Sequence, residues 1–248
     1  MPFTLAHPAI LIPLFRKKLT LSVTGMVIGS MVPDFEFFFR LRVTENIGHH
    51  GMGILLLDIP LALLLCFLFH NIFRNPFINH LPAAYITRTA QYKSFNWNVY
   101  FRKHSFIVFV SILIGVLSHF LLDGFTHFDG FVVTAFPVLS KKIPIISFHI
   151  PLYGLLQALF SLIGMVLLYW KIVLLPQGSE RPLNFSKKLV FWSFLTIASF
   201  SILILRMLLM PMYDTFWDII IAIIGSFIYA SLIISLVYKQ LDKMVMQD

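Results

Sequence analysis

The stretch SFIVFVSILIGVLSHFLLDGFTH, residues 105–127, joins an apolar run of membrane-spanning length to a polar motif at its end. In that motif His119, Asp123 and His127 follow one another at intervals of four residues. Residues four apart in a helix lie on one face, one above the other. The stretch therefore predicts a spanning helix that presents His119 and Asp123 on one face, with His127 next in line if the turn continues.

Composition extends this interpretation to the whole chain. Of the 248 residues, 58% are hydrophobic and 12% are charged, and the mean hydropathy is +0.86. Soluble domains carry roughly 25% charged residues, so the composition indicates an integral membrane protein. The single cysteine, Cys66, lies inside an apolar run, which excludes an intramolecular disulfide and disfavours a thiolate metal site.

Four further apolar runs, besides residues 105–122, are long enough to span a bilayer: 51–69, 150–175, 189–210 and 216–238. Residues 3–15 and 19–32 are also apolar, but the second would reach only about 21 Å against a hydrocarbon core of roughly 30 Å. We expect an all-α, polytopic membrane helix bundle with about five spanning helices and an N-terminal short helical hairpin.

Several shorter features complete the expected organisation. Small residues within residues 25–30 permit a neighbouring helix to approach closely. Residues 71–104 are interfacial in composition, and residues 124–149 are typical of a loop. We expect one compact domain, in which residues 1–175 form the region of the polar motifs and residues 176–248 add two transmembrane helices.

Charge gives the expected orientation. The net charge of +8 would suggest nucleic acid in a soluble protein, but the basic residues lie in short loops beside apolar runs. One side of the five-span arrangement holds eleven of the nineteen Lys and Arg residues, which predicts that this side is cytoplasmic. The expected partner is the lipid bilayer, with no nucleic acid, and the polar motifs face the extracytoplasmic side.

The polar motifs fall at the ends of apolar segments that the topology brings to one membrane depth. Their candidate metal ligands are His7, Asp34, His49, Asp58, His119, Asp123 and His127. Imidazole and carboxylate bind Zn, Mn or Fe when no thiolate is available. Seven such groups exceed the needs of one ion, so they fit two ions or one ion with supporting residues. The alternative is that they form His–Asp hydrogen bonds that hold helix ends together.

Other ionisable groups favour structural roles. Arg206 lies inside a spanning run and is expected to pair with Asp214 or Asp218, or else to bind an anionic headgroup. His70 lies too far along its helix from Asp58 to share a site. His80 falls in the segment interpreted as a loop, where an interfacial polar role is expected.

Four blocks of the sequence, taken in order, resemble the bacterial membrane-protein family labelled domain of unknown function 4184. They are MPFTLAHP at residues 1–8, GSMVPDFE at 29–36, LDIP at 57–60 and SHFLLDGFTH at 118–127. The resemblance covers residues 1 to about 175. In that family a His stands nine residues before the Asp of the third block, which points to His49; here His50 replaces the usual hydroxyl residue and leaves the choice between the two open. The family is more distantly similar to membrane-bound metal-dependent hydrolases.

These observations lead to a first functional hypothesis and two alternatives. The first is a bacterial inner-membrane hydrolase that binds a divalent metal, Zn with Mn or Fe as alternatives, and acts on an amphiphilic phosphate ester. In it Asp34 or Asp58 is the base that deprotonates the attacking water. The alternatives are an ion-coupled transporter that relays protons or cations through its His and Asp residues, and a non-catalytic membrane assembly protein.

Overall fold

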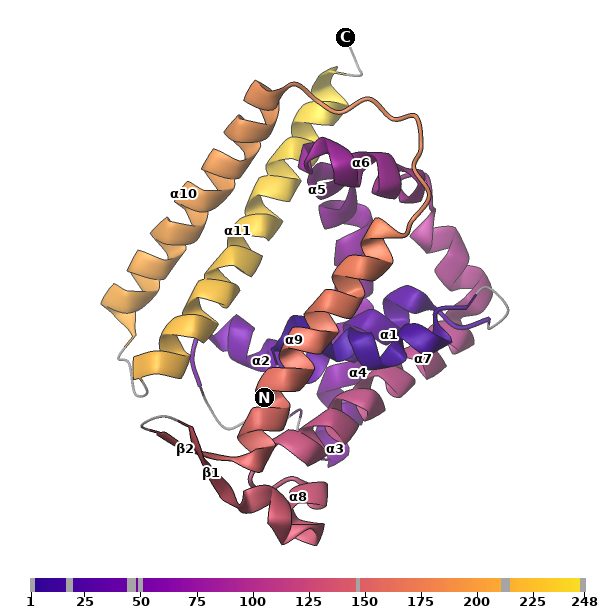
Figure 1. The fold of residues 1–248 in the computed structure, drawn as a ribbon. Coiled ribbons are helices and arrows are strands. Elements are labelled where there is room, and N and C mark those ends of the chain that lie inside the picture. The colour runs from indigo at the N-terminus through magenta and orange to yellow at the C-terminus, as the bar shows by residue number, and fades with distance from the viewer. Residues whose placement is uncertain are drawn as a thin grey trace. The chain divides into compact units, whose positions relative to one another are not determined.

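The computed structural model describes residues 3–16, 20–43, 48, 51–145, 148–210 and 215–245, most of which are helical (Figure 1). Five helical stretches are long and apolar enough to cross a membrane: Gly51–His80, Trp97–Thr126, Leu152–Val173, Phe185–Leu209 and Phe216–Leu241. The predicted all-α polytopic bundle with about five spanning helices is therefore confirmed.

The helical elements follow one another from a 3-10 helix at the N-terminus to a long C-terminal helix. In chain order they are η1 (Thr4–Leu14), α1 (Val23–Gly29), α2 (Val32–Arg40), α3 (Gly51–Gly53), η2 (Ile54–Asp58), α4 (Ile59–Leu68), η3 (Phe69–Phe73), α5 (Arg74–His80), α6 (Ala83–Thr89), η4 (Ala90–Tyr92), α7 (Trp97–Thr126), α8 (Phe131–Ala135), η5 (Pro137–Ser140), α9 (Leu152–Val173), α10 (Phe185–Leu209) and α11 (Thr215–Val245).

The chain forms two compact units, each built from three separate segments. The first unit contains Met1–Pro33, Gly51–Leu63 and His104–Ile172. The second contains Asp34–His50, Leu64–Lys103 and Val173–Asp248. The chain passes from the second unit to the first at His104, where α7 has a non-helical backbone conformation with φ −133° and ψ 29°.

Two spanning helices extend beyond the predicted runs. The first does not stop at residue 69 but continues through α5, because apolar residues at helical spacing still find packing partners there: the rings of Phe77 and Phe191 lie 5.6 Å apart. The helix α7 begins at Trp97 rather than at residue 105. Asn96 caps this start, since its side-chain oxygen accepts a hydrogen bond from the Val99 N–H at 3.1 Å.

In the first unit, α1 packs directly against the backbone of α7. A Cβ atom added to Gly29 would collide with the carbonyl of Ile112, and one added to Gly115 would collide with the carbonyl of Met26. The Ser22 N–H also donates a 2.8 Å hydrogen bond to Ser111 Oγ. The small residues predicted to allow close helix approach therefore do so, and they hold the end of α1 against α7.

The N-terminal helix η1 is held by α9. It keeps a 3-10 form over eleven residues with two internal prolines, which lack the N–H that an α-helix would use. A Cβ atom added to Gly164 of α9 would lie 2.9 Å from the Cβ of Ala6, so the two elements touch at a glycine. The Phe3 N–H donates to Ser161 Oγ at 2.8 Å, which fixes the start of η1 on the same helix.

The segment 124–149, predicted as a loop, contains more structure than expected. It includes α8, η5 and the strand β1 (Lys142–Ile145), which pairs antiparallel with β2 (Phe148–Pro151). Ile143 faces Ile150 in the register of this hairpin. These elements are only four or five residues long, too short to produce a recognisable hydrophobic period.

In the second unit, α10 and α11 lie side by side (Figure 1) around a core of Phe191, Leu195 and Ala230. The prediction that His80 lies in a loop is wrong. It is the buried last residue of α5, where its ring stacks on Phe191 with centroids 4.1 Å apart and its Nδ1–H donates to the Pro76 carbonyl at 2.7 Å. The stacking contact with Phe191 stabilises the buried ring, and an exposed loop position would not provide it.

The intramembrane Arg206 has the acidic partner that the sequence indicates. Its guanidinium lies 3.7 Å from Asp218 Oδ2, and its Nε–H donates to the Leu41 carbonyl at 2.9 Å. Asp218 also accepts a 2.7 Å hydrogen bond from the Val43 N–H. The alternative partner, Asp214, lies outside the described residues. Both charges of the pair are buried, and each makes a further hydrogen bond to the backbone of residues 41–43.

Candidate metal centre

Three predicted ligands, all in the first unit, form one buried group. His7 of η1 and His119 and Asp123 of α7 each offer a ligand atom, and these atoms lie within 4.8 Å of one another. The Nε2 atoms of His7 and His119 lie 3.6 Å and 3.2 Å from the Asp123 carboxylate oxygens. The two imidazole rings stack with centroids 4.3 Å apart. The group could therefore hold a metal ion.

Two kinds of local structure position the three side chains. His119 and Asp123 are four residues apart in a continuous helix, so they share one face as the spacing predicts. His7 reaches them through tertiary packing, in which η1 contacts α1 and, at Ala6, Gly164 of α9. One pair of ligands is therefore set by helix geometry, and the third by tertiary packing.

The hydrogen bonds of the two histidines define which nitrogen carries the proton. The Nδ1 of His7 lies 3.2 Å from the Thr4 carbonyl, and the Nδ1 of His119 lies 3.0 Å from the Ser30 carbonyl. A carbonyl only accepts, so each Nδ1 must be the protonated donor. In the neutral ring Nε2 is then the lone-pair nitrogen, as in metal-binding histidines whose other nitrogen is held by a backbone carbonyl.

This tautomer has an electrostatic consequence. Two Nε2 lone pairs face a carboxylate, so three electron-rich groups converge in a buried space. A divalent cation would satisfy all three groups together, and two imidazoles with one carboxylate are a known ligand set for Zn and Fe.

His127 lies beside this group without joining it. Its Nδ1 is 3.6 Å from Asp123 Oδ1 and 3.2 Å from the Asp123 backbone carbonyl, which accepts its hydrogen bond. Burial lowers the pKa of His127, while the nearby Asp123 carboxylate opposes this shift. The structure thus places His127 against the carboxylate rather than among the three ligand atoms.

The other predicted ligands have different placements. Asp58 belongs to the first unit and is 1% exposed in the π-helical turn η2, outside the group of ligand atoms within 4.8 Å. Asp34 is fully buried at the start of α2 in the second unit. His49 and His50 lie outside the described residues.

Sequence reasoning misses the supports of the site. The carbonyl of Ser30 holds His119 because Gly29 and Gly115 bring α1 and α7 together. The small residues of segment 25–30 signal a close helix contact, but nothing in their spacing identifies α7 as the partner. The role of the Thr4 carbonyl cannot be predicted from the sequence, because a backbone group does not depend on the residue type.

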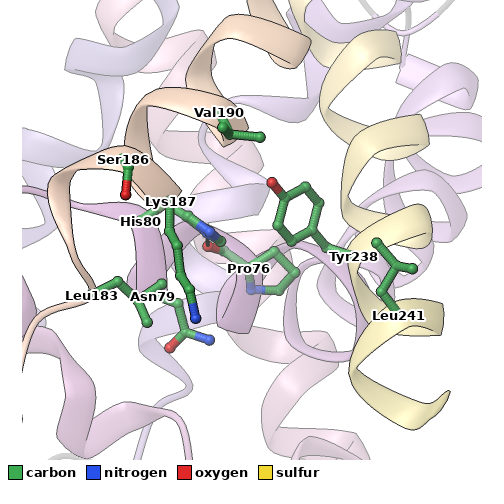
Figure 2. A pocket seen from close by; sticks show the side chains of 9 residues that line it. All are labelled: Pro76, Asn79, His80, Leu183, Ser186, Lys187, Val190, Tyr238 and Leu241. Carbon is green, nitrogen blue, oxygen red and sulfur yellow. Dashed lines mark hydrogen bonds between the residues drawn. The ribbon is translucent and has the colours of Figure 1, made fainter. Parts of the chain in front are cut away.

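A separate cavity of about 410 Å³ lies in the second unit, between side chains of α5, α10 and α11 (Figure 2). Its lining is largely apolar, with Lys187, Asn79 and the Tyr238 hydroxyl among the polar contributors. No acidic residue lines it within the described part of the chain. It is therefore not a second metal centre.

The fold and the site together define a class: a multi-pass helical membrane protein with a buried His and Asp group able to hold a metal ion. Within that class, the chain belongs to the family described as "Domain of unknown function (DUF4184)", which matches residues 1–237. The match extends past residue 175 into the last two spans. No curated protein and no solved structure matches the chain.

Proposed function

We propose that this protein is a bacterial inner-membrane, metal-dependent hydrolase that acts on an amphiphilic phosphate ester. The observation that supports this most is the convergence of the His7 and His119 Nε2 atoms on Asp123, with both Nδ1 atoms held by backbone carbonyls. Three protein ligands leave coordination positions for water and substrate, which is the arrangement of catalytic rather than structural zinc.

The proposed chemistry divides between the ion and the chain. A divalent ion bound at this site would supply Lewis acidity and a water nucleophile at neutral pH. His7 and His119 would hold it through Nε2, and the carbonyls of Thr4 and Ser30 would fix their orientation. Zn is the first candidate because of the ligand set, and Mn or Fe are the alternatives.

The remaining predicted residues have proposed roles around this group. Asp58 would be the general base that takes the proton from the attacking water, since it is a buried carboxylate of the same unit; Asp34, the alternative predicted from the sequence, is a buried carboxylate of the second unit. His127, which lies against Asp123, would support the ligand set, and His49 remains a predicted ligand.

The substrate class follows from the surroundings. Asp123 lies at the end of a spanning helix, so the site would meet the membrane at headgroup depth, where a phosphate ester with an apolar tail places its phosphate. The bias of basic residues toward the opposite side supports an extracytoplasmic site.

Metal analysis of the purified, detergent-solubilised protein after reloading with Zn, Mn or Fe tests the proposal. We expect stoichiometric metal in the native chain and little in His119→Ala and Asp123→Ala. His149→Ala is the matched control, because His149 is an exposed histidine of the same unit. Hydrolysis of long-chain phosphate esters, followed by phosphorus NMR, should show the same dependence. A folded native protein that binds none of the three metals after reloading would contradict the proposal and favour a transporter or assembly role.

A further inference from the structure

A second polar site lies in the second unit, where the end of the first span meets the start of α7. Its cavity, about 300 Å³, is lined by the side chains of four asparagines, Asn71, Asn75, Asn96 and Asn98, and by Arg74 and Lys93. No carboxylate lines it within the described residues.

Arg74 is the central charge of this site. It is only 7% exposed, and its guanidinium is held by neutral acceptors: the Phe95 and Lys93 carbonyls at 2.7 Å and 2.8 Å, Asn75 Oδ1 at 3.0 Å and His70 Nδ1 at 3.1 Å. These bonds orient the group but do not neutralise it. Within the described residues no acidic side chain contacts Arg74, so a buried positive charge faces the cavity without a counterion.

The asparagines add hydrogen-bond donors. Asn75 Oδ1 accepts from Arg74 Nε, and Asn96 Oδ1 accepts from the Val99 N–H. Both partners can only donate, so the amide oxygens are fixed in these positions and each NH₂ group is left to face elsewhere. The Asn71 NH₂ donates to Asn98 Oδ1 at 3.1 Å, so the donors that the lining adds to the Arg74 charge are the NH₂ groups of Asn75 and Asn96.

Two lysines and one glutamate make contacts near the cavity within the described residues. Lys93 is engaged by Glu180 at 2.6 Å, which neutralises that one lysine. Lys239 of α11 donates to the Asn71 carbonyl at 2.9 Å and brings a further positive charge. The balance around the cavity stays positive, as an anionic ligand requires.

We propose that this cavity binds the phosphate group of an anionic phospholipid. The buried Arg74 and the amide donors lie at the start of the spanning helix α7, which places a phosphate-binding lining near the headgroup level. Anionic lipids of the cytoplasmic leaflet are attracted to basic segments of this kind. This site is in a different unit from the candidate metal centre and does not depend on the hydrolase proposal.

The test measures lipid binding by the full-length protein in nanodiscs of phosphatidylcholine with and without phosphatidylglycerol. Thermal unfolding and native mass spectrometry give two independent readouts. We expect phosphatidylglycerol to raise the unfolding temperature of the native protein and to remain bound in the mass spectrum.

Two variants place a negative charge in the cavity and keep the existing hydrogen bonds. In Asn75→Asp a carboxylate replaces the amide that accepts a hydrogen bond from Arg74. In Asn96→Asp the new carboxylate still caps α7, because aspartate is as good an N-cap residue as asparagine. We expect both to fold and to bind phosphatidylglycerol at least about tenfold more weakly. Asn79→Asp is the matched control, because it makes the same charge change on α5 outside this cavity.

Three results would overturn the proposal. One is equal stabilisation by the two nanodisc compositions. Another is unchanged phosphatidylglycerol affinity in Asn75→Asp and Asn96→Asp. The third is full stabilisation by inorganic phosphate alone, which would assign the cavity to a free anion instead of a lipid.

Discussion

Replacing Gly115 by alanine should separate α1 from α7 and weaken the candidate metal centre without touching a ligand. The added Cβ would lie 2.7 Å from the Ser30 nitrogen and would collide with the Met26 carbonyl, whereas ordinary contact begins at 3.4 Å. Both neighbours are backbone atoms of α1 and its end, so no side chain can move aside. The helix α1 must retreat by at least 0.7 Å, the difference between 3.4 Å and 2.7 Å, to restore contact distance.

This displacement reaches the site through one hydrogen bond. The Ser30 carbonyl accepts from His119 Nδ1 at 3.0 Å, and a shift of that size would lengthen the bond to roughly 3.7 Å, beyond hydrogen-bonding range. Losing a partner that orients a metal-binding histidine typically weakens metal affinity about 10–100-fold. Overpacking should also lower the free energy of unfolding by about 1–3 kcal/mol.

Zinc titration of the detergent-solubilised protein measures the affinity, and helical content by circular dichroism establishes that the variant is folded. Gly154→Ala is the matched control: it also places alanine in a spanning helix of the first unit, but its nearest contact would be an ordinary 3.4 Å. It should keep full zinc affinity and gain up to about 1 kcal/mol from helix propensity. A folded Gly115→Ala protein with native zinc affinity would refute the proposed link between the helix contact and His119.

Three further outcomes are expected. Saturating zinc should stabilise the native protein, by about 2.7 kcal/mol at a concentration 100 times Kd, and the effect should vanish in Asp123→Asn; equal stabilisation of both would contradict the ligand role of Asp123. Asp218→Asn should destabilise the chain by about 3–5 kcal/mol in chemical unfolding, because it leaves the buried Arg206 charge uncompensated; a cost below about 1 kcal/mol would oppose this. Phe191→Ala should cost about 3–5 kcal/mol, because its fully buried ring packs against His80, whereas Phe194→Ala on the same helix, 55% exposed, should cost far less.

Much of the architecture is predictable from local sequence. Long apolar runs must form helices in a bilayer because every backbone group needs an internal partner, so the five spans can be identified by length and hydropathy. The residues at which the helices end are harder to predict from length and hydropathy. The extension of α7 to Trp97 depends on the Asn96 cap, and that of the first span depends on the packing of Phe77 against Phe191.

The pairing of His119 with Asp123 needs nothing beyond the helix repeat, which puts residues four apart on one face. Which of the other His and Asp residues meets that pair is decided by long-range packing. His7 reaches it through the packing of η1 against α1 and Gly164, and Ser30 reaches His119 through glycines that let two backbones touch. The spacing of residues determines only which side chains are neighbours along one helix. Contacts between distant segments depend on how side-chain volumes and backbone surfaces fit together in the folded chain.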